Sequence, residues 1–131
     1  MDGYHAKVLK RRALGFLENA KDNFGRGEYD LTLFHVEQFL QLYLKYLLYE
    51  KVGAYPKTRS IIHLFKEAMK VFEDDEIREF FDKNLEAINL LEDAYITSRY
   101  LPREYDERIA EKMLDFAKEA LEVLRCLEKR L

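Results

Sequence analysis

The stretch YDLTLFHVEQFLQLYLKYLLYEKV, residues 29–52, decides the fold. Wound as an α-helix, it carries apolar side chains around most of its circumference, and a helix of that kind is buried on several sides. These side chains are Leu31, Leu33, Phe34, Val36, Phe39, Leu40, Leu42, Tyr43, Leu44, Tyr46, Leu47 and Leu48. The sequence therefore predicts a central helix with other helices packed around it.

One narrow sector of this helix is polar. At about 100° per residue, Glu37, Gln38, Gln41 and Lys45 fall close together on the helical wheel. We call these four residues the polar seam. Because an unpaired buried charge is costly, the seam needs partners from a neighbouring helix.

Apolar residues at helical spacing predict further helices on both sides of this segment. A first helix runs from about residue 4 to 23 and ends near Gly25 or Gly27, and a third helix follows the loop GAYPKTRS with Thr58 or Ser60 as its cap. A restart capped by Asp74 or Asp75 leads into a fourth helix that continues to Pro102. A last helix spans about 106–130, with its apolar seam at Met113, Ala117, Ala120, Leu124, Leu127 and Leu131.

Short loops force successive long helices to run antiparallel. The expected fold is all-α, an up-down antiparallel four-helix bundle with one short accessory helix between the third and fourth helices. No internal repeat or long linker divides the chain, so we expect a single helical domain over residues 1–131.

Composition excludes several classes of protein. The hydrophobic fraction of 48% beside a charged fraction of 36% favours a soluble globular protein, and a net charge of −3 gives no overall positive field for nucleic acid. The single cysteine, Cys126, is expected to be a small buried side chain and points to a reducing, cytoplasmic setting. No signal peptide or membrane span is expected, and the abundance of Glu, Lys and Arg leans towards a heat-adapted source.

Most catalytic patterns are missing. The sequence contains no glycine-rich phosphate loop, H-E-x-x-H motif or Glu-x-x-His pattern, so we predict no metal site and no cofactor. The three histidines, His5, His35 and His63, are scattered over separate helices and are assigned no role.

A second polar stripe faces the polar seam in this scheme. Glu92, Tyr95 and Arg99 share one face of the fourth helix at i, i+3 and i+7. One interpretation is a structural network in which Glu37 and Glu92 partner the two cations. The other is a site for an anionic group, where Arg99 binds phosphate bidentately, Lys45 adds a charge, and Tyr95 or Tyr100 offers a stacking ring.

The segments GEYDLTLFHVEQFLQLYLKYLLYEKVGAYPKT and YITSRYLP resemble the HEPN domain, a nucleotide-binding fold of higher eukaryotes and prokaryotes, in its prokaryotic stand-alone form. The resemblance covers nearly the whole chain. The residues that match the family pattern of the second helix are Phe34, Gln38, Gln41 in the place of an acid, and Lys45. Those that match the end of its fourth helix are Tyr95, Arg99 and Tyr100, with Leu101 intervening before Pro102.

The chain also departs from the family. Many members carry a His directly after the Thr that Thr58 matches, where this chain has Arg59. Family ribonucleases carry an Arg followed after four to six residues by a His. Here no His follows Arg99, and the interval from Arg59 to His63 is one residue too short. Because His is the side chain best tuned for metal-independent RNA cleavage, we expect no ribonuclease activity.

The resemblance implies a homodimer, pairing with a small nucleotidyltransferase in a toxin-antitoxin-like module, and binding of nucleotide or RNA. Nine Phe and nine Tyr, and a second helix more apolar than three neighbours can cover, also favour a dimer. The hypothesis is a non-catalytic binding module whose ligand-binding residues are Gln38, Gln41, Lys45, Glu92, Tyr95, Arg99 and Tyr100. The alternatives are a divergent ribonuclease toxin that uses Tyr or Lys, and a purely structural helical dimer.

Overall fold

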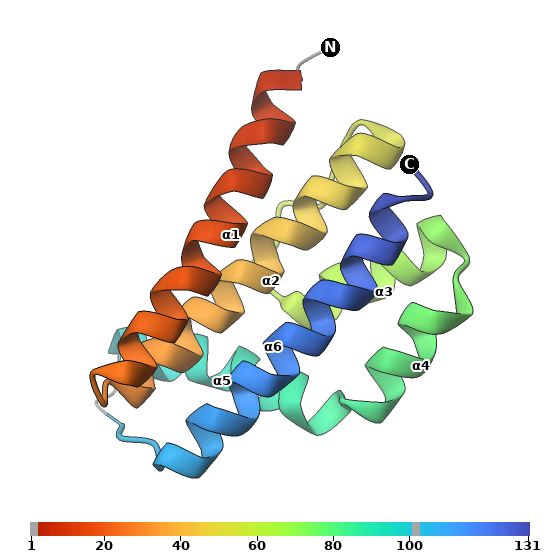
Figure 1. The fold of residues 1–131 in the computed structure, drawn as a ribbon. Helices are drawn as coiled ribbons and strands as arrows, with labels where there is room; N and C mark the ends of the chain where they lie inside the picture. Colours follow the sequence, from red (N-terminus) through yellow and green to blue (C-terminus); the bar gives the residue numbers. More distant parts are fainter. Residues whose placement is uncertain (1–2, 101–102) are drawn as a thin grey trace.

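The computed structural model describes residues 3–100 and 103–131, with side chains for 3–97 and 103–131. Every regular element in these residues is a helix (Figure 1). The helices are α1 (Gly3–Gly25), α2 (Tyr29–Val52), α3 (Ile61–Phe72), α4 (Asp75–Lys83), α5 (Leu85–Tyr100) and α6 (Glu107–Glu128). The expected all-helical bundle is confirmed, and α2 has the bounds expected from its sequence.

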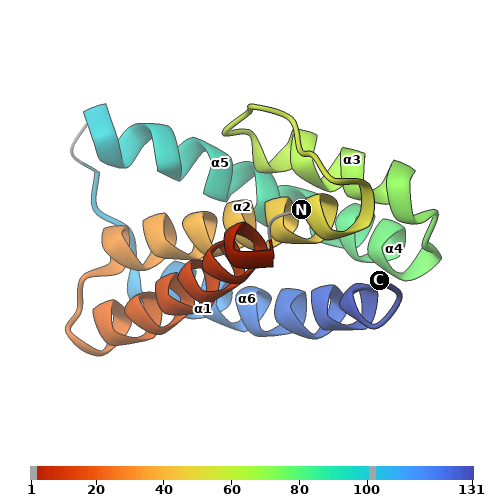
Figure 2. The ribbon, with the colours of Figure 1, turned by 90° about the horizontal axis from the view of Figure 1, so that it is seen from above.

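Helix α2 is the centre of the bundle. It packs against α1, α3, α5 and α6, with α1 and α6 along one side and α3 and α5 along the other (Figure 2). Helices α1 and α2 lie side by side over most of their length, joined by a short turn at Gly27. The fold thus places any side chain of α2 between helices from distant parts of the chain.

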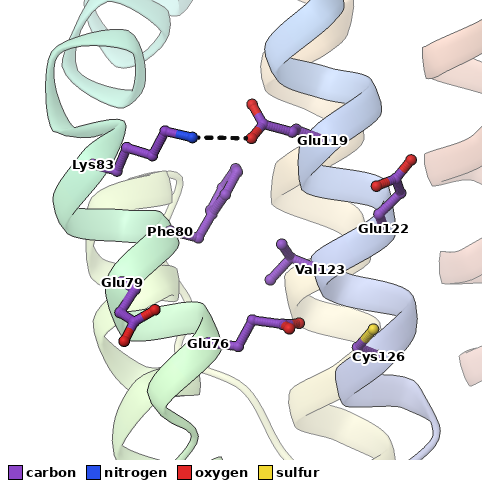
Figure 3. A pocket seen from close by; sticks show the side chains of 8 residues that line it. All are labelled: Glu76, Glu79, Phe80, Lys83, Glu119, Glu122, Val123 and Cys126. Carbon is purple, nitrogen blue, oxygen red and sulfur yellow. Dashed lines mark hydrogen bonds and ion pairs between the residues drawn. The ribbon is translucent and has the colours of Figure 1, made fainter.

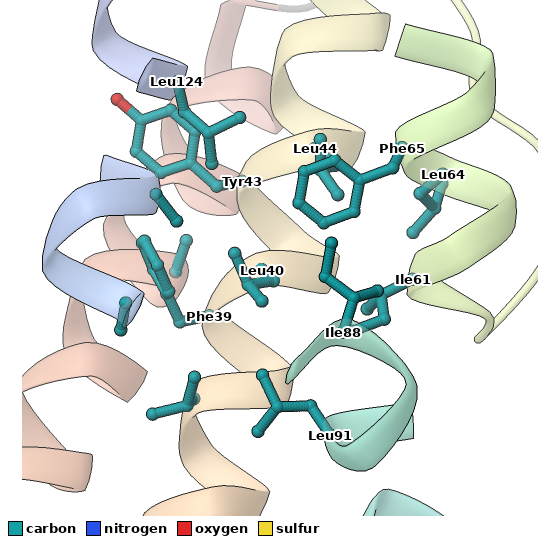
Figure 4. Close-up of a cluster of buried hydrophobic side chains, with 14 of the residues drawn as sticks. Phe39, Leu40, Tyr43, Leu44, Ile61, Leu64, Phe65, Ile88, Leu91 and Leu124 are labelled. Atoms are coloured by element: carbon teal, nitrogen blue, oxygen red, sulfur yellow. The ribbon is translucent and has the colours of Figure 1, made fainter. Parts of the chain in front are cut away.

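The core surrounds the middle of α2. Phe39, Leu40, Tyr43 and Leu44 are completely buried and meet side chains from α3, α5 and α6, among them Phe65 (Figure 4). Burial of one such side chain stabilises the fold by about 1.5–3 kcal/mol. Because one chain covers α2 on all these sides, its apolar surface no longer argues for a dimer.

Caps and left-handed turns set the helix ends. The Ser60 hydroxyl accepts a hydrogen bond from the His63 backbone N–H (3.1 Å) at the start of α3, and the Asp74 carboxylate accepts one from the Ile77 N–H (3.0 Å) at the start of α4. Gly53 ends α2 with φ 79°, a conformation that side chains with a Cβ disfavour. Of the candidate caps, Ser60 and Asp74 are the ones used.

The short accessory helix expected between the third and fourth long helices is α4, and Asn84 separates it from α5. The Asn84 backbone N–H makes the last i→i−4 bond of α4, to the Phe80 carbonyl (3.0 Å), and its side-chain amide donates to the same carbonyl (2.9 Å). The side-chain bond competes with the backbone for that acceptor. The chain therefore changes direction between α4 and α5 (Figure 1).

Two expectations about α6 are wrong. Cys126 is exposed, because the buried stripe of α6 runs through Leu124 and Leu127 and position 126 falls outside it. Leu131 follows the end of the helix and is 46% exposed. Among the described helices, none has the length and apolar character needed to cross a bilayer.

Candidate functional site

The polar seam of α2 is a continuous chain of hydrogen bonds. The Gln38 amide donates to one carboxylate oxygen of Glu37 (2.8 Å), and the Gln41 amide donates to the other (3.1 Å). One turn further, the Lys45 ammonium donates to the Gln41 amide oxygen (3.4 Å). The sequence placed these four residues in one sector, and the structure brings them into direct contact.

Glu37 has an unusual environment for a carboxyl group. Its side chain is completely buried, and burial raises its pKa to about 7, assisted by the nearby negative charge of Glu92. The pKa of Glu37 is lowered by hydrogen bonds from the amides of Gln38 and Gln41 and by the positive charge of Lys45. With a pKa near neutrality, Glu37 is charged in only part of the molecules at pH 7.

Arg59, in the loop before α3, completes the seam from outside α2. Its carbonyl accepts a hydrogen bond from the Gln41 amide (3.3 Å), and its guanidinium donates to the Tyr95 hydroxyl (3.3 Å). The Tyr95 ring stacks on Phe34 with 5.9 Å between centroids and 8° between planes. One exposed arginine thus connects the α2 seam to α5.

Lys45 and Arg59 are close enough to affect each other. Burial lowers the pKa of Lys45, and the positive charge of Arg59 lowers it further, whereas Glu37 raises it. The Lys45 ammonium also lies 5.5 Å from the centre of the Tyr55 ring. Two positive charges held near one another repel, and an anion that binds both offsets this repulsion.

Glu92 joins α5 to the start of α3. Its carboxylate accepts hydrogen bonds from the Ser60 hydroxyl (2.8 Å) and from the Ile62 backbone N–H (3.2 Å). These bonds tie α5 to the first turn of α3, directly after Arg59. Glu92 is therefore placed to hold the loop that carries Arg59, and the described partner of Lys45 is Gln41. The expected pairing of Glu92 with Arg99 lies outside the described side chains and stays a prediction.

Five of the seven predicted site residues are described with their side chains. The seam residues Gln38, Gln41 and Lys45 connect through Arg59 to Tyr95, while Glu92 holds the adjoining loop. The side chains of Arg99 and Tyr100, and all of Pro102, lie outside the described residues. Expectations for these three residues remain predictions.

Sequence reasoning noticed Arg59 only as a departure from the family pattern and left it out of the site. One signal in the sequence marked it: it stands in a loop beside Thr58, where many family members have His. Loops held by a rigid scaffold often carry binding residues. The hydrogen bonds that join this loop to α2 and α5 appear only in three dimensions.

The seam can bind an anion from solvent. Arg59 is exposed and Lys45 is half-buried, so both charges are accessible. A guanidinium binds phosphate through two parallel hydrogen bonds, and an ammonium adds a compact charge. The Tyr95 hydroxyl lies beside the guanidinium. This set of groups suits a phosphate or another oxyanion.

A hollow lies between α4 and α6, and its charge is opposite to that of Lys45 and Arg59. Figure 3 shows four glutamates around its rim, Glu76, Glu79, Glu119 and Glu122. Its one lysine, Lys83, already pairs with Glu119 at 3.4 Å. The hollow, of about 330 Å³, therefore repels phosphate. In the described residues, the glutamates of this hollow included, no three His, Cys, Asp or Glu side chains are grouped to hold a metal ion.

A family model of the HEPN domain matches residues 6–127, which is nearly the whole chain. No curated protein and no solved structure matches it.

Proposed function

The chain belongs to the HEPN domain family, and we propose that it is a non-catalytic module that binds nucleotide or RNA through the phosphate. The binding residues are Lys45 and Arg59, with Gln41 and Tyr95 beside them. Arg99 and Tyr100, at the end of α5, belong to the same proposal on the strength of the family pattern.

The observation that carries the proposal is the meeting of two cations at one seam. Gln41 contacts both residues, since its amide oxygen accepts from the Lys45 ammonium and its amide nitrogen donates to the backbone carbonyl of Arg59. The Arg59 guanidinium itself is close enough to lower the pKa of Lys45, after the larger effect of burial. Among the described residues, no carboxylate accepts a hydrogen bond from Arg59. Its guanidinium donates to the neutral hydroxyl of Tyr95. Cations arranged in this way are available for a phosphate ligand.

Cleavage is the second candidate function, and one observation favours it. A carboxyl with a pKa of about 7 is well tuned for general acid–base catalysis, and Glu37 has that property. Glu37 is, however, fully buried behind the amides of Gln38 and Gln41, and it lacks the exposure that attack on a 2′-hydroxyl requires. We therefore place binding ahead of cleavage.

Two partners belong to the proposal because the family resemblance implies them. One is a second copy of this chain, and the other is a small nucleotidyltransferase in a toxin-antitoxin-like pair. Light scattering at micromolar concentration tests the first: a homodimer has twice the chain mass of 15.7 kDa. A mass of 15.7 kDa at every concentration would contradict it.

The binding function is tested with a fluorescently labelled single-stranded RNA and anisotropy titration. We expect Lys45→Ala and Arg59→Ala each to weaken binding by about tenfold, the equivalent of about 1.4 kcal/mol for one charge-assisted contact. Lys112→Ala is the matched control, because Lys112 is exposed on α6, on the other side of α2. Equal losses in all three variants, or binding that none of them alters, would refute the site.

A further inference from the structure

The polar seam continues one turn beyond Lys45 into aromatic side chains. Tyr49 follows Lys45 at i+4, and its ring lies 4.9 Å from that of His5 in an edge-on contact. The His5 Nε2 atom lies 3.0 Å from the Tyr55 hydroxyl, and the two tyrosine rings are 6.1 Å apart. We call His5, Tyr49 and Tyr55 the aromatic cluster. It joins α1, α2 and the loop before α3.

A hollow of about 330 Å³ opens beside the cluster. Tyr49 and Glu50 line it together with Gly3 and Gly53. Open space lies beside both glycines, because a Cβ atom built on either would meet no atom within 4 Å. At Gly53, φ is 79°, so the turn that shapes this edge strongly favours glycine.

Lys45 lies between the polar seam and the aromatic cluster. Its ammonium lies 5.5 Å from the centre of the Tyr55 ring and also bonds to Gln41. Tyr49 follows Lys45 by four residues, so the two share nearly the same face of α2, one turn apart. A nucleotide whose phosphate is held at Lys45 can therefore direct its base towards the aromatic cluster.

We propose that the aromatic cluster and its hollow form a nucleobase subsite, in which a base stacks on Tyr49 while its phosphate is held by Lys45. This inference rests on the proposed function and adds the class of ligand, a single-stranded RNA segment or nucleotide that is recognised by its base. The volume is at the small end of ligand pockets and suits one base rather than a whole oligonucleotide.

Glu50 gives the subsite a preference. A carboxylate only accepts hydrogen bonds, and adenine, cytosine and guanine offer exocyclic amino donors, whereas uracil presents carbonyl oxygens in their place. Stacking on an aromatic ring tolerates any base. The ring therefore provides affinity, and Glu50 favours bases that have an amino group.

The experiment compares three labelled probes of equal length: oligoadenylate, oligouridylate and an abasic ribose-phosphate oligomer. We expect Tyr49→Leu to weaken oligoadenylate binding by about tenfold and to leave the abasic probe unchanged. Lys45→Ala weakens all three probes. Tyr29→Leu, a half-buried tyrosine at the opposite end of α2, is the control and leaves oligoadenylate binding intact.

Two further variants sharpen the result. Tyr55→Leu lies in a loop and tests the cluster without altering a helix, so it replaces Tyr49→Leu if thermal melting shows that the latter is misfolded. Glu50→Gln, which offers both a donor and an acceptor, should reduce the preference for oligoadenylate over oligouridylate by several-fold.

The outcomes separate this inference from the function on which it rests. If wild-type protein binds the abasic probe as tightly as oligoadenylate, and the tyrosine variants change nothing, the nucleobase subsite is overturned while phosphate binding stands. If none of the three probes binds, both proposals are overturned. Selective loss of oligoadenylate binding in the tyrosine variants supports the subsite.

Discussion

Replacing Glu37 by Gln should make the protein more stable at pH 8.5 and much less sensitive to pH. The folded state raises the pKa of Glu37 from 4.5 to about 7 because the carboxyl is buried. Between these two values the folded protein keeps a proton that the unfolded chain has released. Stability therefore falls as pH rises from about 4.5 through about 7, and Gln, which does not titrate, removes that loss.

The magnitude follows from the two pKa values. Each tenfold change in an ionisation constant corresponds to about 1.4 kcal/mol, so the interval from 4.5 to about 7 corresponds to about 3 kcal/mol of lost stability above pH 8. At pH 5 most of that loss has not yet occurred. At this pH, Glu37→Gln should be neutral or destabilising by about 1 kcal/mol. The amides of Gln38 and Gln41 donate to the two oxygens of Glu37, and a glutamine side chain keeps only one oxygen as acceptor.

Urea denaturation of both proteins at pH 5, 6, 7 and 8.5 tests this reasoning. Other titrating groups are common to the two proteins, so the difference in unfolding free energy isolates Glu37. We expect this difference to change by about 2–3 kcal/mol in favour of the variant between pH 5 and pH 8.5. Parallel pH profiles would show that Glu37 has an ordinary pKa and would refute the argument.

Two further predictions concern the ligand and a second carboxylate. RNA affinity should fall by roughly threefold to tenfold as pH rises from 6 to 8, because ionised Glu37 places a negative charge near the phosphate, and anisotropy titrations of Glu37→Gln should be nearly flat. Glu128→Gln should destabilise the fold by about 1–2 kcal/mol in urea, because its carboxylate accepts from Tyr43 and from Tyr46 (2.9 Å). The exposed Glu119→Gln should change stability by less than about 0.5 kcal/mol, and an equal loss in both variants would contradict a special role for Glu128.

The central helix could be predicted because its signal is local and strong. The apolar residues of 29–52 fill nearly every direction around the helix, and only burial on several sides accommodates that pattern. The polar seam could be predicted from the same helix, because residues spaced by one turn share a face. Both predictions depend on a single element and need no knowledge of its neighbours.

The position of the boundary between α4 and α5 was not predictable in the same way. Apolar residues continue at helical spacing on both sides of Asn84, and the feature that marks the end of α4 is its side-chain amide, which bonds to the Phe80 carbonyl beside the last backbone bond of that helix. Asparagine occurs within many helices, so its presence alone does not mark a boundary. Cys126 was expected to be buried because cysteine is commonly a buried residue type. Its position on the helical wheel of α6, outside the apolar stripe, indicated the exposure that the structure has.

The site was only partly predictable, because its remaining parts depend on contacts between distant segments. Glu92 bonds to Ser60, 32 residues away, and that contact holds the loop in which Arg59 reaches Tyr95. A helical wheel shows which residues share a face, but it does not show which loop lies against that face. In the phosphate site that we propose, Glu92 would act through the position of Arg59, because its contact with Ser60 ties the loop before α3 to α5. Lys45 belongs to α2 and Arg59 to that loop, so the proposed site depends on how the loop is held against the helix.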